Sequence, residues 1–153
     1  MDTQQLLALE QEIQFESFSE ETAWRLGSIL VNDANSKSLP VAIDISVNGR
    51  QLFFHSLSGA PADLWYWIQR KIRLVNRVGH SSMYISCLLK EKNTTIEKEL
   101  LIPESEFAPH GGCFPIIIRG TGVIGTVTVS GLPQEEDHEL VVSGIRAYLA
   151  LVL

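Results

Sequence analysis

Hydrophobic side chains recur along the chain with two different periods, and the change between them predicts helices alternating with β-hairpins. Apolar residues at every third or fourth position are typical of a helix with one buried face, whereas alternation at every second position is typical of a strand. The pattern predicts helices that begin near residues 2, 19, 60, 82 and 134, and strands at 41–47, 50–56, 115–119 and 123–130. The first two helices have Asp2 or Thr3 and Ser19 as candidate N-caps.

The first hairpin has the strongest local signal, because Asn48-Gly49 suits a two-residue turn in which both positions need positive φ. With such a turn, Val47 faces Arg50 and the alternation of the two strands places four apolar residues on one face of the hairpin. These are Ile43, Ile45, Leu52 and Phe54. The other face carries Ala42, Asp44, Phe53 and His55.

Two hairpins separated by helices indicate a largely antiparallel sheet whose faces the helices cover. We therefore expect an α+β fold rather than a doubly wound parallel one. No repeat, low-complexity tract or linker interrupts the pattern, so residues 1–153 are expected to form one domain.

Charge and composition exclude several classes of function. The formal net charge of −6 opposes general nucleic-acid binding, which needs a surplus of Lys and Arg. The two cysteines, Cys87 and Cys113, form no CxxC pair, and the four histidines have no metal-ligand spacing, so no metal site is expected. The polar N-terminus and the lack of a long apolar run predict neither a signal peptide nor a membrane span, which makes a cytoplasmic location the expectation.

A formal GxGxxG motif occupies Gly120 to Gly125. A dinucleotide site needs these glycines between a strand and the N-terminus of a helix, which meets the pyrophosphate. Here the β-rich stretch Thr126–Ser130 follows, so we interpret the glycines as a tight turn with a close backbone approach.

Two short segments are candidates for a small-ligand site. Arg70 and Lys71 lie on the basic side of the third predicted helix, and His80, Ser81 and Ser82 follow it. A histidine near these cations could help to hold an anionic ligand, although His-Ser-Ser is also a common cap between two helices. A basic stripe on a helix is also commonly just a solvated face.

His110-Gly111-Gly112 is the second candidate segment. Its backbone N–H groups could bind an anion and its imidazole could ligate a metal or heme, or the segment could be a turn with an exposed histidine. The other two histidines are weaker candidates for a ligand site. His55 lies diagonally opposite Asp44 on the strand pair, where a surface contact is expected. His138 is expected to be solvated on the acidic start of the last helix.

The chain from Pro40 to Leu149 resembles the HbpS/GlcG-like superfamily, also called the heme-degrading domain family, and within it a branch of uncharacterised proteins. The likeness lies in Val41–Ile45, Trp67–Lys71, Gly79–Ser82, His110–Ile116, Gly122–Gly125 and Ser130–Gly131, in that order. This chain has His110 where relatives carry a charged or small residue before the paired glycines. The resemblance implies a profilin-like α/β/α sandwich around a roughly five-stranded antiparallel sheet, usually in closed oligomers. It also names heme as a candidate ligand, because some relatives bind it.

These observations lead us to expect a binding protein for a small anionic ligand, with heme or a porphyrin as the named candidate. The alternatives are a scaffold that docks protein partners without a ligand, and a heme-degrading enzyme. We also expect a homo-oligomer, because Tyr148–Leu153 offers no polar face and Trp65, Tyr66 and Trp67 cannot all point to one side of a helix. The C-terminal helix or the Trp65–Trp67 segment is the expected interface.

Overall fold

A computed structural model describes the whole chain, residues 1–153. Six helices and four strands follow one another in an order that matches the predicted alternation, and none of the helices is long and apolar enough to cross a bilayer. The elements are α1 (Thr3–Glu12), α2 (Glu20–Ser36), β1 (Ala42–Val47), β2 (Arg50–Ser56), α3 (Leu64–Val78), α4 (Ser82–Glu91), α5 (Ile96–Glu99), β3 (Cys113–Ile118), β4 (Gly122–Ser130) and α6 (Gln134–Val152).

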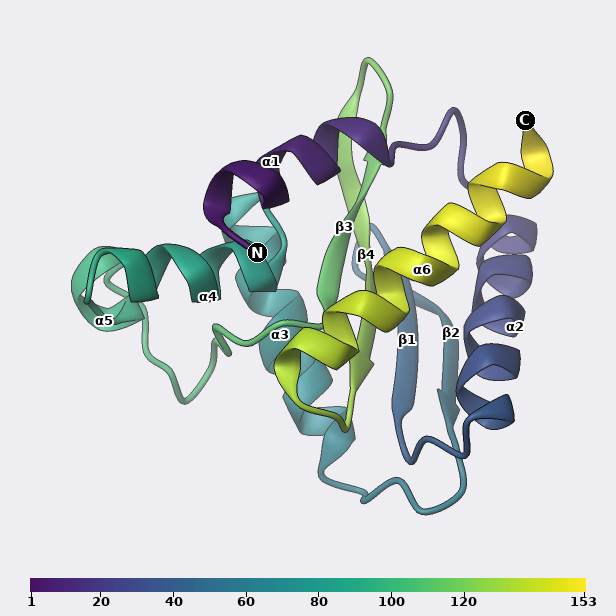
Figure 1. Cartoon of the computed structure of the whole chain (residues 1–153), viewed down its shortest axis with the longest axis horizontal. Helices are drawn as coiled ribbons and strands as arrows, with labels where there is room; N and C mark the ends of the chain where they lie inside the picture. The colour runs from purple at the N-terminus through teal and green to yellow at the C-terminus, as the bar shows by residue number, and fades with distance from the viewer.

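The four strands form one antiparallel sheet in the order β2-β1-β4-β3. Helices α2 and α6 pack together on one face of this sheet, and α3 covers the other face (Figure 1). Helices α1 and α4 pack against each other beside β3 (Figure 1). The α+β prediction is confirmed, with four strands, as the periodicity indicates, rather than the roughly five that the resemblance implies.

The two faces of the sheet differ in chemistry because the strands alternate. The face under α2 and α6 carries the main core, to which β1 and β4 contribute Ile43, Ile45, Val127 and Val129, all fully buried. The face under α3 is largely polar and buried as well. It carries Asp44, Cys113, Thr126, Thr128 and Ser130. Buried polar groups need hydrogen-bond partners, and a cluster of them on a covered sheet face is a common feature of ligand sites. The α3 side of the sheet is therefore the better candidate for a functional site.

Helix caps follow the sequence predictions closely. Asp2 accepts a hydrogen bond from the backbone N–H of Gln5, and Ser19 accepts one from Thr22, each within a capping box. Gly79 ends α3 in the left-handed conformation, with φ of 74°. The short helix α5 was not predicted, since its four residues are too few to show a helical period.

The first hairpin is confirmed, with Asn48 and Gly49 at φ of 52° and 78° and with Val47 paired to Arg50. Its register beyond the turn differs from the predicted one. The pairing shifts between Ile45 and Ser46, so β2 contains one extra residue relative to β1. A bulge of this kind moves every later side chain of the bulged strand to the opposite face.

The bulge exchanges the predicted roles of two phenylalanines. Ile45 faces Phe53, which packs on the main core beside α2, whereas Phe54 lies on the α3 side with Leu64 and Ile68. The prediction that Phe54 joins Ile43 and Ile45 in the core is therefore wrong.

The predicted surface contact between Asp44 and His55 is also wrong. The bulge places His55 opposite Ile43, where it is exposed. Asp44 is fully buried and its carboxylate accepts hydrogen bonds from Ser46 Oγ at 2.7 Å and Gln51 Nε2 at 2.8 Å.

Candidate functional site

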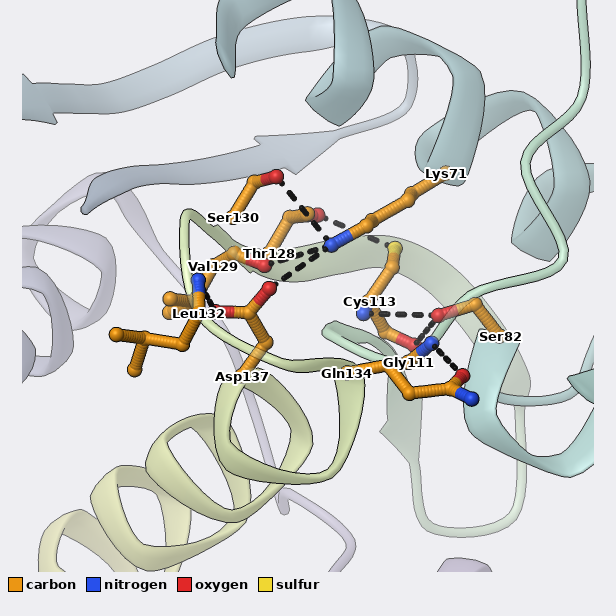
Figure 2. Close-up of polar contacts among 10 residues, drawn as sticks. All are labelled: Lys71, Ser82, Gly111, Cys113, Thr128, Val129, Ser130, Leu132, Gln134 and Asp137. Carbon is orange, nitrogen blue, oxygen red and sulfur yellow. Dashed lines mark hydrogen bonds and ion pairs between the residues drawn. The ribbon is translucent and has the colours of Figure 1, made fainter. Parts of the chain in front are cut away.

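A pocket of about 430 Å³ opens where α3, the loop before β3 and the β4–α6 connection meet. Its apolar walls are Leu64, Trp67 and Leu132. Its polar lining consists of Lys71, His110, Ser130, Gln134 and Asp137. The chain segments that build it lie far apart in sequence, and Figure 2 shows the polar side chains that join them.

Lys71 lies at the base of this pocket, 3% exposed, and not on the solvated basic face that the sequence suggested. Its ammonium group donates to the backbone oxygen of Val129 at 3.2 Å, to Ser130 Oγ at 3.4 Å and to Asp137 Oδ2 at 3.2 Å (Figure 2). An ammonium group has three hydrogens, so these acceptors use all of them. Lys71 therefore ties α3 to the end of β4 and to the first turn of α6.

The Lys71–Asp137 pair lies in a desolvated environment. Burial raises the pKa of Asp137 to about 6, although Lys71 and the backbone N–H of Leu132 oppose the shift. Burial also lowers the pKa of Lys71, against the attraction of Asp137. Each charge therefore helps to hold the other in the pocket, together with the hydrogen bonds that each forms with neighbouring groups.

The paired glycines of the predicted motif allow this close packing. A Cβ on Gly112 would lie 2.3 Å from the backbone oxygen of Val129 and 2.8 Å from Lys71 Nζ, and Gly112 has φ of 129°. A Cβ on Gly111 would lie 2.6 Å from the backbone oxygen of Gln134. The Gln134 side chain also accepts the Gly111 N–H at 2.9 Å, which fixes the loop against α6 (Figure 2).

His110 stands at the mouth of the pocket, half-buried. Its ring lies edge-on to Trp67, with 5.7 Å between the ring centroids. Its Nε2 lies 3.9 Å from Glu104 Oε1. Desolvation lowers the pKa of His110, which favours the neutral imidazole, and a neutral imidazole has one ring nitrogen with a free lone pair.

Arg70 lies beside the mouth, outside the pocket lining. Its guanidinium lies 4.6 Å from the centre of the Trp67 ring and donates to the backbone oxygen of Glu104. Arg73, one turn further along α3, likewise donates to the backbone oxygen of Glu106. Neither arginine forms an ion pair, although the loop that accepts their hydrogen bonds also carries the carboxylates of Glu104 and Glu106.

The structure does not bring His80 and Ser81 to this pocket. His80 Nδ1 lies 2.7 Å from Glu10 Oε1 of α1, and its ring packs on Tyr84. Ser81 is the N-cap of α4: its hydroxyl accepts the Tyr84 N–H, and its own N–H donates to Glu10. The interpretation of His-Ser-Ser as a cap between helices is confirmed.

Several pocket residues were missed by sequence reasoning. Trp67 and Ser130 belong to segments that carry the family resemblance, but neither was selected as a site residue. Gln134 and Asp137 lie at the acidic start of the last helix and gave no signal of a site. His138, expected to be solvated, is 2% exposed, packs near Phe114 and has its pKa lowered to about 4 by burial. Its Nε2 has no hydrogen-bond partner.

Comparisons with known proteins identify the family of the chain. Residues 18–146 match the family model described as haem degrading protein HbpS-like. A UPF0303 protein from Rhizobium meliloti is 43% identical over 97% of this chain and 90% of its own length, and one from Acidobacterium capsulatum is 47% identical over 90% and 83%.

Solved structures agree with this placement. The crystal structure of the Ybr137w protein superposes with a TM-score of 0.92 at 34% identity, covering 99% of this chain and 90% of that one. The PduOC:Heme complex shares the fold, with a TM-score of 0.71 at 18% identity over 86% of this chain and 94% of its own. The chain therefore belongs to the HbpS-like family.

Proposed function

We propose that the protein binds a small anionic ligand in the pocket beneath the His110-Gly111-Gly112 loop. The observation that carries this proposal is the joining of His110, Trp67 and the buried Lys71–Asp137 pair in one pocket. Pockets of a few hundred cubic ångströms with apolar walls and few placed polar groups are typical of small-ligand sites.

Two arginines beside the mouth could bind an anion. The positive charge of Lys71 is already balanced by Asp137. Arg70 and Arg73 donate to backbone oxygens and form no ion pair. A carboxylate at the mouth would gain a charge-assisted hydrogen bond from Arg70 if the guanidinium exchanged its backbone partner for the ligand.

Heme is the candidate ligand named by the family resemblance, and His110 at the mouth of the pocket would be the residue to ligate its iron. Heme iron takes a neutral imidazole as a ligand, and burial favours that form of His110. Trp67, Leu64 and Leu132 offer apolar surface beside it, and Arg70 could pair with a propionate. No second histidine lines the pocket. The family description and the PduOC:Heme complex support this candidate.

The test is a hemin titration followed by the Soret band, on wild type, His110→Ala and His55→Ala. His55 is an exposed histidine on β2, so His55→Ala is a matched control for nonspecific coordination. The proposal expects a Soret shift in wild type and His55→Ala that weakens at least about tenfold in His110→Ala, since one iron–nitrogen bond is lost. Equal titrations for all three proteins would remove heme as the ligand of this pocket.

If no Soret shift appears, the same variants should be tested for binding of sodium benzoate, a planar carboxylate with an apolar ring, by isothermal titration calorimetry. Binding by wild type that His110→Ala weakens supports the small-anion proposal without heme. No Soret shift with hemin and no heat of binding with benzoate would favour the scaffold alternative.

The proposal includes self-association. Trp65 is 43% exposed and Tyr66 is 64% exposed on α3, and the last three residues of the chain are also apolar and exposed. Apolar surface of this extent usually marks an interface, which supports a homo-oligomer.

A further inference from the structure

Lys71 is the one buried lysine of the chain, and it lines a pocket. It lies at the base of the pocket beneath His110, and two of its hydrogen-bond acceptors, Ser130 Oγ and Asp137 Oδ2, belong to residues that line the same pocket (Figure 2). The remaining four lysines are all exposed, and they are Lys37, Lys90, Lys92 and Lys98. A buried amine inside a ligand-sized pocket is an arrangement that lysine nucleophiles share.

An amine must lose a proton before it attacks a carbonyl carbon, and the surroundings of Lys71 favour that loss. Burial beside the apolar wall lowers the pKa of Lys71, although the attraction of Asp137 opposes the change. The opposite holds for Lys92 on the exposed surface, where the hydrogen bond to Glu99 raises the pKa of the lysine. At neutral pH the free amine is therefore a larger fraction of Lys71 than of Lys92.

Asp137 is placed to accept that proton. Its Oδ2 lies 3.2 Å from Lys71 Nζ, and its Oδ1 accepts the backbone N–H of Leu132 at 3.0 Å, which holds the carboxylate toward the amine. Burial raises the pKa of Asp137 to about 6, against the effect of Lys71. Because burial disfavours both charges, an amine beside a carboxylic acid lies closer in free energy to the ion pair here than in water. Cys113 adds no competing charge, since burial raises the pKa of its thiol to about 12.

We propose that Lys71 forms a Schiff base with a small oxo acid, which is a ketone or aldehyde that also carries a carboxylate. The amine nitrogen bonds to the carbonyl carbon as the carbon–oxygen double bond opens, and Asp137 gives its proton to the oxygen. Asp137 then takes a second proton from the nitrogen and passes it to the oxygen, which leaves as water. An ammonium and a carbonyl group become a protonated imine and water, with no oxidant or reductant. The protonated imine keeps the positive charge that balances Asp137.

The carboxylate of such a ligand has partners nearer the mouth. Gln134 lines the pocket, and of its side-chain amide only the oxygen is engaged, by the Gly111 N–H, which leaves the amide nitrogen available as a donor. Arg70 lies beside the mouth and forms no ion pair. The inference rests on the proposed function, because it assigns a covalent step to the small anion that this pocket is proposed to bind.

Reductive trapping of the wild-type protein with pyruvate tests the inference without relying on a variant. Sodium cyanoborohydride at pH 7 converts an imine into a stable secondary amine, and mass spectrometry of a proteolytic digest reports the adduct at each lysine. Lys71 should carry at least about ten times more adduct than Lys92, because each unit of pKa difference changes the free amine tenfold. Sodium benzoate should protect Lys71 and leave Lys92 unaffected. Acetone is the matched control probe: it is a ketone of similar size without the carboxylate, and it should label Lys71 less than pyruvate does.

Lys71→Arg and Lys92→Arg are the matched variants. Lys71→Arg keeps a cation beside Asp137 but has no amine that forms an imine, so it should abolish the pocket adduct while Lys92 is labelled as in wild type. Lys92→Arg removes an exposed amine and should leave the adduct at Lys71 unchanged. An unchanged far-UV circular dichroism spectrum will verify the fold of each variant.

The outcomes separate this inference from the proposed function. Pyruvate that binds in isothermal titration calorimetry but leaves no adduct on Lys71, or that labels all lysines equally, overturns the Schiff base and leaves the anion site intact. Equal labelling of Lys71 by acetone and pyruvate overturns the assignment of an acid. No heat of binding and no adduct overturns the Schiff base, and the benzoate titration then decides the anion site on its own.

Discussion

Lys71 of α3 and Asp137 of α6 form a buried ion pair, with 3.2 Å between Nζ and Oδ2 and with each side chain 3% exposed. The two residues are separated by 66 positions in sequence, and their contact closes the base of the pocket against the end of β4. The pair joins three elements that no other polar contact joins at this point (Figure 2).

Removing one member of this pair should destabilise the folded protein. Lys71→Met leaves the Asp137 carboxylate buried without its cation, which should lower the free energy of unfolding by roughly 3–5 kcal/mol. The double variant Lys71→Met with Asp137→Leu removes both charges and should be the more stable of the two. Urea unfolding at pH 7 measures the free energy of unfolding of both variants. A single variant within about 1 kcal/mol of wild type would show that the pair contributes little.

Gly112 should tolerate alanine worse than another left-handed glycine does. A Cβ there overlaps the Val129 oxygen and approaches Lys71 Nζ, whereas a Cβ on Gly79 meets nothing within 4 Å. Gly79→Ala should cost roughly 1–2 kcal/mol from backbone strain alone. Gly112→Ala should cost about 1–3 kcal/mol more, because overpacking is added. Equal losses in thermal unfolding would mean that the loop relaxes away from Lys71 without penalty.

His138 should make the protein less stable in mild acid. Its pKa is about 4 in the folded chain and about 6.5 when unfolded, so between these values the unfolded chain binds more protons. Its contribution is fully present above pH 6.5 and is lost as the pH falls toward 4. Asp137, whose raised pKa of about 6 acts in the opposite direction, and His110, whose lowered pKa acts in the same direction, are common to wild type and variant.

The comparison of wild type with His138→Gln isolates that contribution. Relative to the variant, wild type should lose stability from pH 6.5 to 4 by an amount approaching about 3 kcal/mol. Urea midpoints at several pH values give the difference. Parallel profiles for the two proteins would show that His138 gains a partner or solvent access when charged.

The fold was predictable from sequence where short-range chemistry decides the structure. Asp2, Ser19 and the Asn48-Gly49 turn act within a few residues of themselves, and the structure has each in the predicted role. The register beyond the turn was not predictable, because one bulge beside Ile45 exchanges the faces of Phe53 and Phe54. Nothing in the alternation of β2 marks which residue is the extra one.

The candidate site was predictable only in part, because its residues come from segments that are far apart in the sequence. The loop at Gly111-Gly112 and the cation Lys71 were selected from their residue types, and the structure places them in contact at the pocket. The partner of Lys71 lies 66 residues away, and the partner of His80 is Glu10, 70 residues away. Pairings at such separations are set by the packing of helices on the sheet, which the local pattern of one sequence does not encode.

The most direct test of the proposed site is side-chain NMR of the four histidines, labelled with ¹⁵N, during titration with hemin or sodium benzoate. We expect the His110 resonances to shift or broaden at substoichiometric ligand, while those of His55, His80 and His138 stay unchanged, because His110 is the one histidine that lines the pocket. Ligand binding that leaves His110 unperturbed, or that perturbs His80 instead, would contradict the placement of the site.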